Sequence, residues 1–212
     1  MNPKNQREKL RRKQAAGYVL AGGASSRMGR NKALLLFGGE PLVVHMARLV
    51  AATGIGVTVV GRPEEYEPFG VKAIADDEPG LGPLGGIATA LAHSSRAWNL
   101  IVAVDLPRVT TEWLAALVDR ALDCDAADAV LPRSERGLEP LCGVYHRRCL
   151  EPIRAALGRG VRKVTSGLAG PPACRVAEIP PGEWNRFAAE GRLLENVNTP
   201  REYERAVADE QR

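Results

Sequence analysis

Glycines and two basic side chains lie together near the start of the chain, in the stretch from Gly17 to Lys32, GYVLAGGASSRMGRNK. Glycine has no Cβ, so the backbone at Gly22 and Gly23 can turn sharply and bring its N–H groups close to phosphate oxygens. Arg27 offers a planar fork for two phosphate oxygens, and Lys32 adds a compact positive charge. These residue types predict a phosphate-binding loop rather than a plain strand-to-helix turn.

Two common phosphate loops do not fit this stretch. The Walker loop requires four residues between its glycines and then Gly-Lys-Ser/Thr, whereas Gly29 is followed here by Arg30 and Asn31. The dinucleotide-binding fingerprint requires G-x-G-x-x-G, which this stretch does not contain. The loop is therefore expected to belong to another class of nucleotide-binding protein.

Asp105 is the candidate metal ligand. It follows the apolar run from Asn99 to Val104 and precedes Pro107. Magnesium binds one or two carboxylates together with phosphate oxygens and water, so a carboxylate at the end of a strand beside a phosphate loop suits Mg²⁺. The alternative is that Asp105 serves as a turn or helix-capping residue before Pro107.

A second acidic position comes before a loop of small residues. Asp76 follows the apolar residues 71–75, and the loop from Gly80 to Gly86 reads GLGPLGG. A carboxylate accepts hydrogen bonds from nucleobase or sugar donors, and small residues let the backbone lie against a base or ribose. The alternative is a flexible surface loop. Asp77 takes the same role if the register shifts by one residue.

Two further segments carry polar candidates. In the first, Asn196 and Asn198 precede Thr199 and Pro200, which are typical of the cap and first turn of a closing helix. One asparagine is expected to point into the site while the other fixes the turn. The second segment holds Arg159, Arg162 and Lys163 around two glycines, and such a cluster either binds an anion or is simply solvated at the surface.

Apolar periodicity supplies the elements that would position these residues. The pattern predicts strands at 18–20, 57–60, 71–75, 99–104, 129–131 and 141–145, and helices at 42–50, 87–93, 110–122 and 151–157. Strands that alternate with helices predict an α/β fold with a mostly parallel sheet in three layers. In such folds ligands bind at the carboxyl ends of the strands, where the glycine loop, Asp76 and Asp105 are all expected.

Composition and charge indicate one ordinary domain with a basic extension. Residues 1–16 carry a net charge of +5, so the remaining residues 17–212 carry −1 out of a total of +4. The extension is expected to be disordered, and nucleic acid is not an expected partner. Without a long apolar segment or a signal peptide, the chain is expected to be cytoplasmic, with four cysteines kept as reduced thiols.

The glycine loop resembles the L-A-G-G-x-S-x-R-M-G-x-x-K signature of the nucleotidyltransferases of molybdenum cofactor synthesis. Every fixed position of the signature is filled, by Leu20, Ala21, Gly22, Gly23, Ser25, Arg27, Met28, Gly29 and Lys32. The segments that follow Asp76, Asp105 and Glu195 resemble the same family. The resemblance covers about residues 17–203 and implies a Rossmann-like nucleotidyltransferase fold that joins GTP to the terminal phosphate of molybdopterin.

The resemblance also implies a role for each candidate. Lys32 and Arg27 would hold the triphosphate, Asp105 the Mg²⁺ ion, and Asp76 a base or sugar. The backbone of the Leu20-Ala21-Gly22-Gly23 segment would hold the nucleotide, and Arg162, Lys163, Asn196 and Asn198 would hold the second, phosphorylated substrate. Molybdoenzymes, or other proteins of molybdenum cofactor synthesis, are the macromolecular partners that the resemblance implies.

Three alternatives remain open from the sequence. A sister cytidylyltransferase would carry the same loop, because the backbone groups that read the base have no side-chain signature. Sugar-phosphate nucleotidyltransferases usually carry G-T-R, where this chain has Ser25-Ser26-Arg27. The third alternative is a non-catalytic nucleotide-binding adaptor for molybdoenzymes, although Lys32 and Asp105 are both intact.

Overall fold

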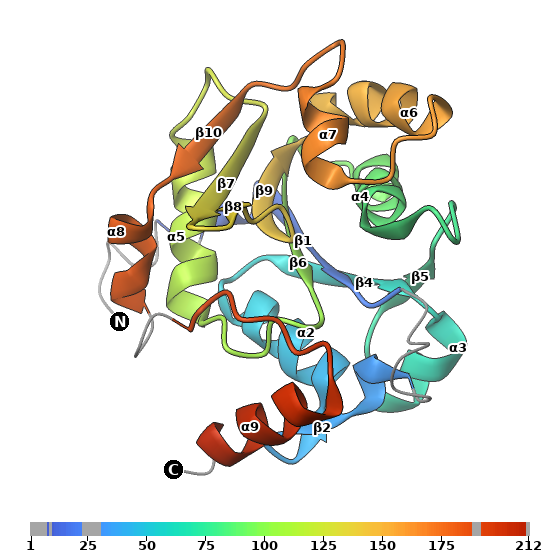
Figure 1. The fold of residues 1–212 in the computed structure, drawn as a ribbon, viewed down its shortest axis with the longest axis vertical. Coiled ribbons are helices and arrows are strands. Elements are labelled where there is room, and N and C mark those ends of the chain that lie inside the picture. The colour runs from blue at the N-terminus through green and yellow to red at the C-terminus, as the bar shows by residue number, and fades with distance from the viewer. Residues whose placement is uncertain (1–7, 9, 23–30, 188–191, 211–212) are drawn as a thin grey trace.

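A central β-sheet organises the structure, which is a computed structural model that describes residue 8 and residues 10–22, 31–187 and 192–210 (Figure 1). The strands of the main sheet run in the order β10-β7-β9-β6-β1-β4-β5, and β8 pairs with β7. Their bounds are β1 Ala15–Leu20, β4 Gly56–Gly61, β5 Ala73–Ala75, β6 Trp98–Ala103, β7 Ala129–Ser134, β8 Gly137–Leu138, β9 Cys142–His146 and β10 Val176–Ile179. A separate two-stranded sheet consists of β2 Leu36–Phe37 and β3 Glu40–Pro41.

Helices connect most of these strands. The α-helices are α2 Leu42–Ala52, α3 Pro63–Tyr66, α4 Gly82–His93, α5 Thr111–Leu122, α6 Leu150–Gly158, α7 Val164–Ala169, α8 Pro181–Trp184 and α9 Pro200–Glu210. Short 3-10 helices occupy Lys32–Leu34, Glu67–Phe69, Arg147–Cys149 and Asn185–Phe187. The predicted helix starts are confirmed at α2, which follows Pro41, and at α5, where the Thr110 side chain accepts a hydrogen bond from the Trp113 N–H.

The sheet is mostly parallel, as the alternation of strands and helices predicts. β1 pairs in parallel with β4 and β6, β4 with β5, and β10 with β7. β9 and β8 are exceptions, because β9 is antiparallel to both β6 and β7, and β8 is antiparallel to β7. All six residues of β6 are buried, as expected for a strand covered by helices on both faces.

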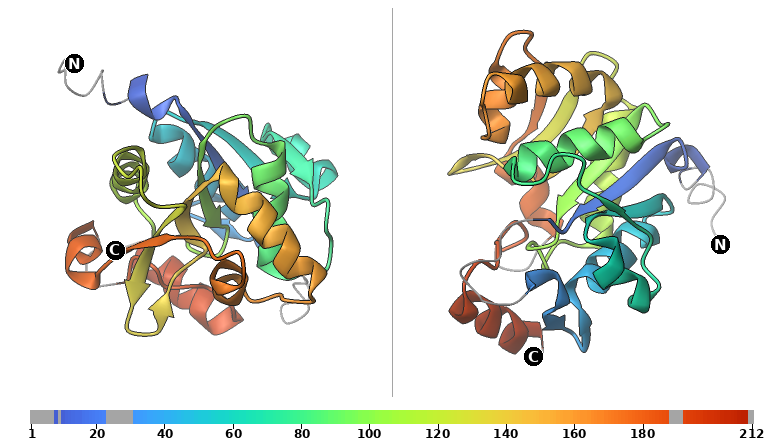
Figure 2. Two further views of the ribbon diagram at one scale, coloured as in Figure 1. Left: turned by 90° about the horizontal axis from the view of Figure 1, so that it is seen from above. Right: turned by 90° about the vertical axis from the view of Figure 1, so that its right-hand side faces the viewer.

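Helices cover both faces of the sheet, which gives the expected three layers (Figures 1 and 2). One apolar core, which includes Met46 of α2 and Leu117 of α5, lies on one face. A second core, which includes Ile87 of α4, Ile153 of α6 and Leu168 of α7, lies on the other. Neighbouring residues of one strand therefore point into different cores.

The structure corrects two expected boundaries. β1 begins at Ala15, so the basic extension ends earlier than residue 16. Ala15 is buried, and Nε of Arg12 donates to Asp119 of α5 at 2.7 Å. Burial and this ion pair therefore tie this part of the chain to the fold. The helix expected at 87–93 begins five residues earlier, at Gly82, because Pro83 suits a first helical turn. In addition, α7 and β10 were not predicted.

Among the described residues, no helix is long and apolar enough to cross a membrane.

Candidate active site

The carboxyl ends of the parallel strands bring the candidate residues together. β1 ends at Leu20 and leads into Ala21 and Gly22, β5 ends just before Asp76, and Asp105 follows β6 by two residues. This edge of the sheet is where ligands bind in open α/β folds. Two of the expected residues, Gly23 and Arg27, lie outside the described residues.

Lys32 lies at the centre of this edge and links two distant segments. Its Nζ atom donates to Oδ2 of Asp105 at 3.2 Å and to Oδ1 of Asn198 at 3.0 Å. The Lys32 and Asp105 side chains are 15% and 20% exposed, so solvent reaches this ion pair only in part. Three residues that the sequence placed at separate motifs therefore form one cluster.

The segment that carries Asn198 is held by two sets of hydrogen bonds. The Val197 N–H donates to the Asp105 carbonyl at 2.9 Å, which fixes this segment to the loop of the proposed metal ligand. The Asn198 and Thr199 N–H groups donate to Oε2 of Glu202 at 2.7 and 2.9 Å, and the Glu202 N–H donates to the Thr199 hydroxyl at 3.2 Å. This is a capping box at the start of α9. These hydrogen bonds, above all that from the Asn198 N–H, lower the pKa of Glu202.

Asp105 has a free carboxylate oxygen. Its Oδ1 atom is buried and has no hydrogen-bond partner among the described residues, whereas Oδ2 accepts from Lys32. A buried, unpartnered carboxylate oxygen is costly unless something binds it. No group of three or more His, Cys, Asp or Glu side chains that could hold a metal occurs in the described part of the chain. Among the described residues, Asp105 is thus a single carboxylate at this point, which suits Mg²⁺, an ion that binds one or two carboxylates together with phosphate oxygens and water.

Asp76 lies beside the glycine loop. Its Oδ1 atom accepts hydrogen bonds from the Thr89 hydroxyl at 2.9 Å and from the Glu78 N–H at 3.1 Å. A Cβ atom placed on Gly22 would lie 3.7 Å from Oδ2 of Asp76. The neighbouring Asp77 is exposed. The structure thus brings Asp76 next to Gly22, so that backbone without a side chain and a carboxylate lie side by side.

The polar backbone atoms of Ala21 are already engaged within the protein. Its N–H donates to the Val60 carbonyl at 2.9 Å, and its carbonyl accepts from the Tyr66 hydroxyl at 3.0 Å. Burial raises the pKa of Tyr66, which keeps this hydroxyl protonated as a donor. The Ala21 N–H is therefore already bonded and not available to a nucleobase. The next described residue of this loop, Gly22, has no side chain, so a ligand can approach its backbone closely.

A cleft of about 190 Å³ opens next to the Lys32 cluster. Its lining is mostly apolar and also includes Glu139, Lys163 and Asn196; the complete lining is Leu106, Leu138, Glu139, Pro140, Leu141, Cys142, Lys163, Val164, Thr165, Leu194 and Asn196. Leu106 directly follows Asp105, and Asn196 is two residues from Asn198. The cleft therefore adjoins the expected metal ligand.

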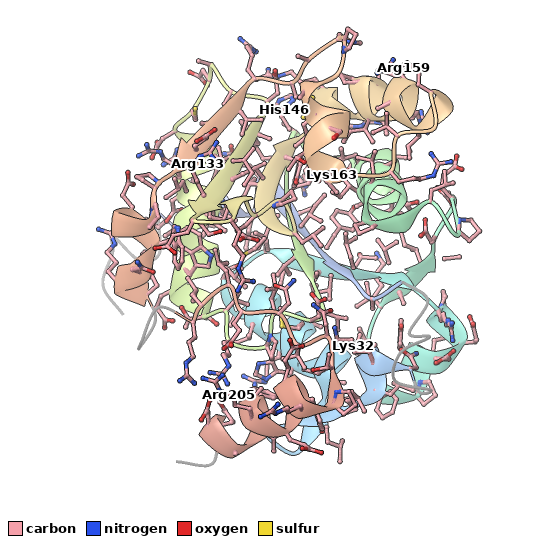
Figure 3. All side chains as sticks on the ribbon, viewed as in Figure 1. Lys32, Arg133, His146, Arg159, Lys163 and Arg205 are labelled. Atoms are coloured by element: carbon pink, nitrogen blue, oxygen red, sulfur yellow. The ribbon has the colours of Figure 1, made fainter. Side chains whose placement is uncertain are left out.

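The basic cluster of the sequence is divided in the structure. Lys163 lines the cleft, but Arg162 donates from Nη1 to the carbonyls of Leu157 and Val161 at 3.2 and 3.1 Å, at the end of α6. In Figure 3, Arg159 lies at the outer end of α6, while Lys163 lies at the start of α7 and Lys32 lies near α9. The Arg162 hydrogen bonds explain the separation, because the guanidinium group binds the carbonyl of Leu157 in the last turn of α6 and that of Val161 just beyond it.

Three residues of the site were not found from the sequence. Tyr66 reaches Ala21 across 45 positions, and Thr89 reaches Asp76 across 13. Glu202 caps the Asn198 turn, and here the T-x-x-E pattern from Thr199 was a usable signal. Tyr66 and Thr89 gave no such signal, because their partners are set by strand order.

Comparison with known proteins agrees with this geometry. The sequence profile described as a MobA-like NTP transferase domain matches residues 17–172. A probable molybdenum cofactor guanylyltransferase from a Nostoc species is 36% identical over 86% of this chain and 85% of its own length. A protein of the same description from Bacillus cereus is 33% identical over 92% of this chain and 96% of its own length.

Solved structures support the same assignment. The molybdopterin-guanine dinucleotide biosynthesis protein A from Archaeoglobus fulgidus superposes with a TM-score of 0.78 at 25% identity, over 92% of this chain and 97% of that one. A CMP-2-keto-3-deoxy-manno-octonic acid synthetase, at 16% identity and a TM-score of 0.69, shares the fold. The expected Rossmann-like nucleotidyltransferase fold is thereby confirmed. The profile, the relatives and the grouping of Lys32, Asp105 and Asn198 together show that the chain belongs to the MobA-like NTP transferase family.

Proposed function

We propose that this protein transfers GMP from GTP to the terminal phosphate of molybdopterin. A phosphate oxygen of molybdopterin attacks the α-phosphorus of GTP, the bond to the β-phosphate breaks, and pyrophosphate leaves. Two relatives that are 36% and 33% identical to this chain over the aligned residues are described as probable molybdenum cofactor guanylyltransferases. The observation that carries the proposal is the cluster of Lys32, Asp105 and Asn198 at the carboxyl ends of β1 and β6.

This chemistry needs positioning and charge neutralisation more than proton transfer. The attacking phosphate is already anionic, so no general base is required, and the catalytic task is to align two anions and neutralise the leaving pyrophosphate. Lys32 supplies a positive charge for the triphosphate, and Arg27 of the loop is assigned to the same task. Asn198 accepts a second hydrogen bond from the Lys32 ammonium and supplies an amide at the phosphates.

We assign Asp105 as the magnesium ligand. Its unpartnered Oδ1 atom supports this assignment, because a buried carboxylate oxygen next to a phosphate site is stabilised by a cation. When bound, Mg²⁺ would neutralise charge on the phosphates and orient them for in-line attack. Lys32 donates to the other carboxylate oxygen of Asp105, Oδ2, and so keeps the Asp105 side chain in place.

The nucleoside of GTP is assigned to the surface formed by Gly22 and Asp76. Gly22 has no side chain to cover its backbone, and the nearby Oδ2 atom of Asp76 can accept hydrogen bonds from sugar or base donors. The Thr89 hydroxyl and the Glu78 N–H donate to the other oxygen of this carboxylate, Oδ1, and hold it in place. Asp76 is therefore preorganised before the nucleotide binds.

Molybdopterin is assigned to the cleft beside Leu106. The apolar walls suit a flat ring system, while Lys163 and Asn196 supply a cation and an amide for its phosphate. This assignment retains Lys163 and Asn196 from the expected second-substrate residues. It moves Asn198 to the Lys32 cluster and removes Arg162, whose guanidinium caps α6.

The alternatives make different predictions for one assay. The purified protein is mixed with Mg²⁺, molybdenum-loaded molybdopterin and GTP, CTP or ATP, and both pyrophosphate and the dinucleotide product are measured. Turnover with GTP alone is the expected result. Turnover with CTP alone would assign the protein as the sister cytidylyltransferase, and nucleotide binding without any product would favour the non-catalytic adaptor.

A substitution at Asp105 tests the metal assignment in the same assay. Asp105→Ala is expected to abolish turnover at every Mg²⁺ concentration, because it removes the one carboxylate assigned to the ion, and chelation of Mg²⁺ should stop the wild-type enzyme. Asp125→Asn, at an exposed aspartate, is the control and should retain full activity. Wild-type turnover by Asp105→Ala would show that Asp105 is not the ligand.

A further inference from the structure

Asp209, near the end of α9, binds two arginines that come from different parts of the chain. Its Oδ2 atom accepts from Nη2 of Arg108 and from Nη1 of Arg192, both at 2.7 Å. Its pKa is lowered, above all by the hydrogen bond from Arg108. The Arg108 side chain is 16% exposed and the Asp209 side chain 31%, so this contact is partly shielded from solvent. We name Arg108, Arg192 and Asp209 the α9 clamp.

The α9 clamp encloses the segment that carries the two asparagines. Arg192 lies before this segment, and α9 with Asp209 follows it, so the two ends of residues 192–200 are tied together. Arg108 follows Asp105 by three residues and ties the same carboxylate to the loop of the metal ligand. One carboxylate thus joins both sides of the site.

Glu195 adds a second contact within this arrangement. Its Oε2 atom lies 3.7 Å from Nη1 of Arg108, and this oxygen is buried with no hydrogen-bond partner among the described residues. A buried carboxylate oxygen without a hydrogen bond depends on nearby positive charge, here that of Arg108. Loss of the Arg108 contact would leave Glu195 uncompensated, next to Asn196.

We propose that Arg108 and Asp209 are positioning residues, which hold the segment of Asn196 and Asn198 against the Asp105 loop. Neither residue is assigned to a substrate. Their effect passes through the Val197 hydrogen bond to the Asp105 carbonyl and through the Asn198 hydrogen bond to Lys32. The clamp therefore fixes the position of Asn196, which lines the cleft, relative to Lys32.

A positioning role predicts a selective kinetic effect, and this part rests on the proposed function. When the clamp is released, Asn196 and Asn198 move, whereas Gly22 and Asp76 stay, because Thr89 holds Asp76 and Tyr66 holds Ala21, the residue before Gly22. The KM for molybdopterin should rise about tenfold in Asp209→Asn, because Asn196 lines its cleft. The KM for GTP should rise less, because only the Asn198 contact with Lys32 is disturbed, while Gly22 and Asp76, which are assigned to the nucleoside, stay in place. A general loss of folded protein would lower kcat and leave both KM values unchanged.

Hydrogen–deuterium exchange tests the clamp without any substrate. In the full-length protein, Asp209→Asn should speed exchange in peptides that cover residues 193–198, which include the Val197 N–H, and leave β1 and β6 unchanged. Glu204→Gln, at an exposed glutamate of the same helix, is the matched control. Asp209→Glu should restore slow exchange and a low KM, since it keeps the negative charge. Should Asp209→Asn fail to fold, Arg108→Gln tests the same contact from its other side.

The two readouts separate the clamp from the proposed reaction. Unchanged exchange at residues 193–198 in a folded Asp209→Asn protein would overturn the clamp. So would a KM for molybdopterin equal to that of Glu204→Gln. Faster exchange in a protein whose wild type forms no guanine dinucleotide would support the clamp and reject the proposed function.

Discussion

At the scale of single residues, the chemistry depends on which polar and charged side chains lie within hydrogen-bond distance of each other. Lys32, Asp105 and Asn198 meet within hydrogen-bond distance although 166 positions separate Lys32 from Asn198. Neighbours in the sequence can be separated just as sharply, since Lys163 lines the cleft while Arg162 binds carbonyls at the end of α6. A basic cluster in a sequence therefore does not identify which cation faces a ligand.

This separation predicts opposite phenotypes for two adjacent basic residues. Lys163→Gln is expected to raise the KM for molybdopterin about tenfold with an unchanged melting temperature, because it removes a cation from the cleft. Arg162→Gln is expected to leave this KM unchanged and to lower the melting temperature, because it removes donors from the end of α6. Steady-state kinetics and thermal unfolding of both variants check the prediction. Equal effects on KM would contradict the division of the cluster.

At the scale of elements, two glycines of α4 allow close packing: Gly86 against the sheet and Gly85 against the residues just before the helix. A Cβ atom on Gly86 would lie 3.4 Å from Cδ2 of Leu20 in β1, and one on Gly85 would lie 3.0 Å from both the Glu78 carbonyl and Cβ of Leu81. The segment that looked like a flexible loop is thus the first turns of a closely packed helix. Its position matters for function because Thr89 of α4 holds Asp76.

Gly85→Ala is expected to destabilise the protein by about 1–3 kcal/mol, because the new methyl group meets backbone that must shift. The shift would also move residues 78–81, which follow Asp76, so the KM for GTP should rise. Gly158→Ala is the matched control: nothing lies within 4 Å of its Cβ position at the end of α6, so a change between zero and about 1 kcal/mol of added stability is expected. Urea unfolding and steady-state kinetics measure both effects, and equal stability of the two variants would contradict the packing argument.

At the scale of the whole molecule, Asp128 joins three strands at the side of the sheet away from β5. It precedes β7 and accepts hydrogen bonds from Nε of Arg148, which follows β9, and from the backbone N–H of Arg175, which precedes β10, at 2.8 Å. The Arg175 side chain also donates to both carboxylate oxygens. The Arg175 hydrogen bond is the main cause of the lowered pKa of Asp128.

The lowered pKa of Asp128 predicts a specific loss of stability in acid. A group with a lower pKa in the folded state stabilises that state fully above its unfolded pKa of about 4, and the contribution falls as the pH drops below that value. Asp128→Asn should therefore be clearly less stable than the wild type at neutral pH, and the difference should shrink as the pH falls below about 4. Urea unfolding of both proteins across this range measures it, with Asp125→Asn as the control. A difference that stays constant with pH would contradict the prediction.

The sequence by itself determined the local features. Residue types and spacing identified the glycine loop, Lys32 and Asp105, because an anion site needs close backbone and positive charge at a few adjacent positions. Apolar periodicity identified most strands and the helices α2, α5 and α6, because burial of one face repeats along the chain. The alternation of strands and helices predicted the parallel sheet, and the T-P step predicted the start of α9.

Only the tertiary structure decided which distant residues meet. The strand order places β9 antiparallel between β6 and β7, and this arrangement brings Glu139 and Lys163 to one cleft. The Asn198 contact with Lys32 and the contact of Asp209 with Arg108 depend on how α9 returns to the sheet edge. Such pairs leave no pattern in the sequence, because hydrogen bonds and ion pairs depend on distances in space that chain spacing does not encode.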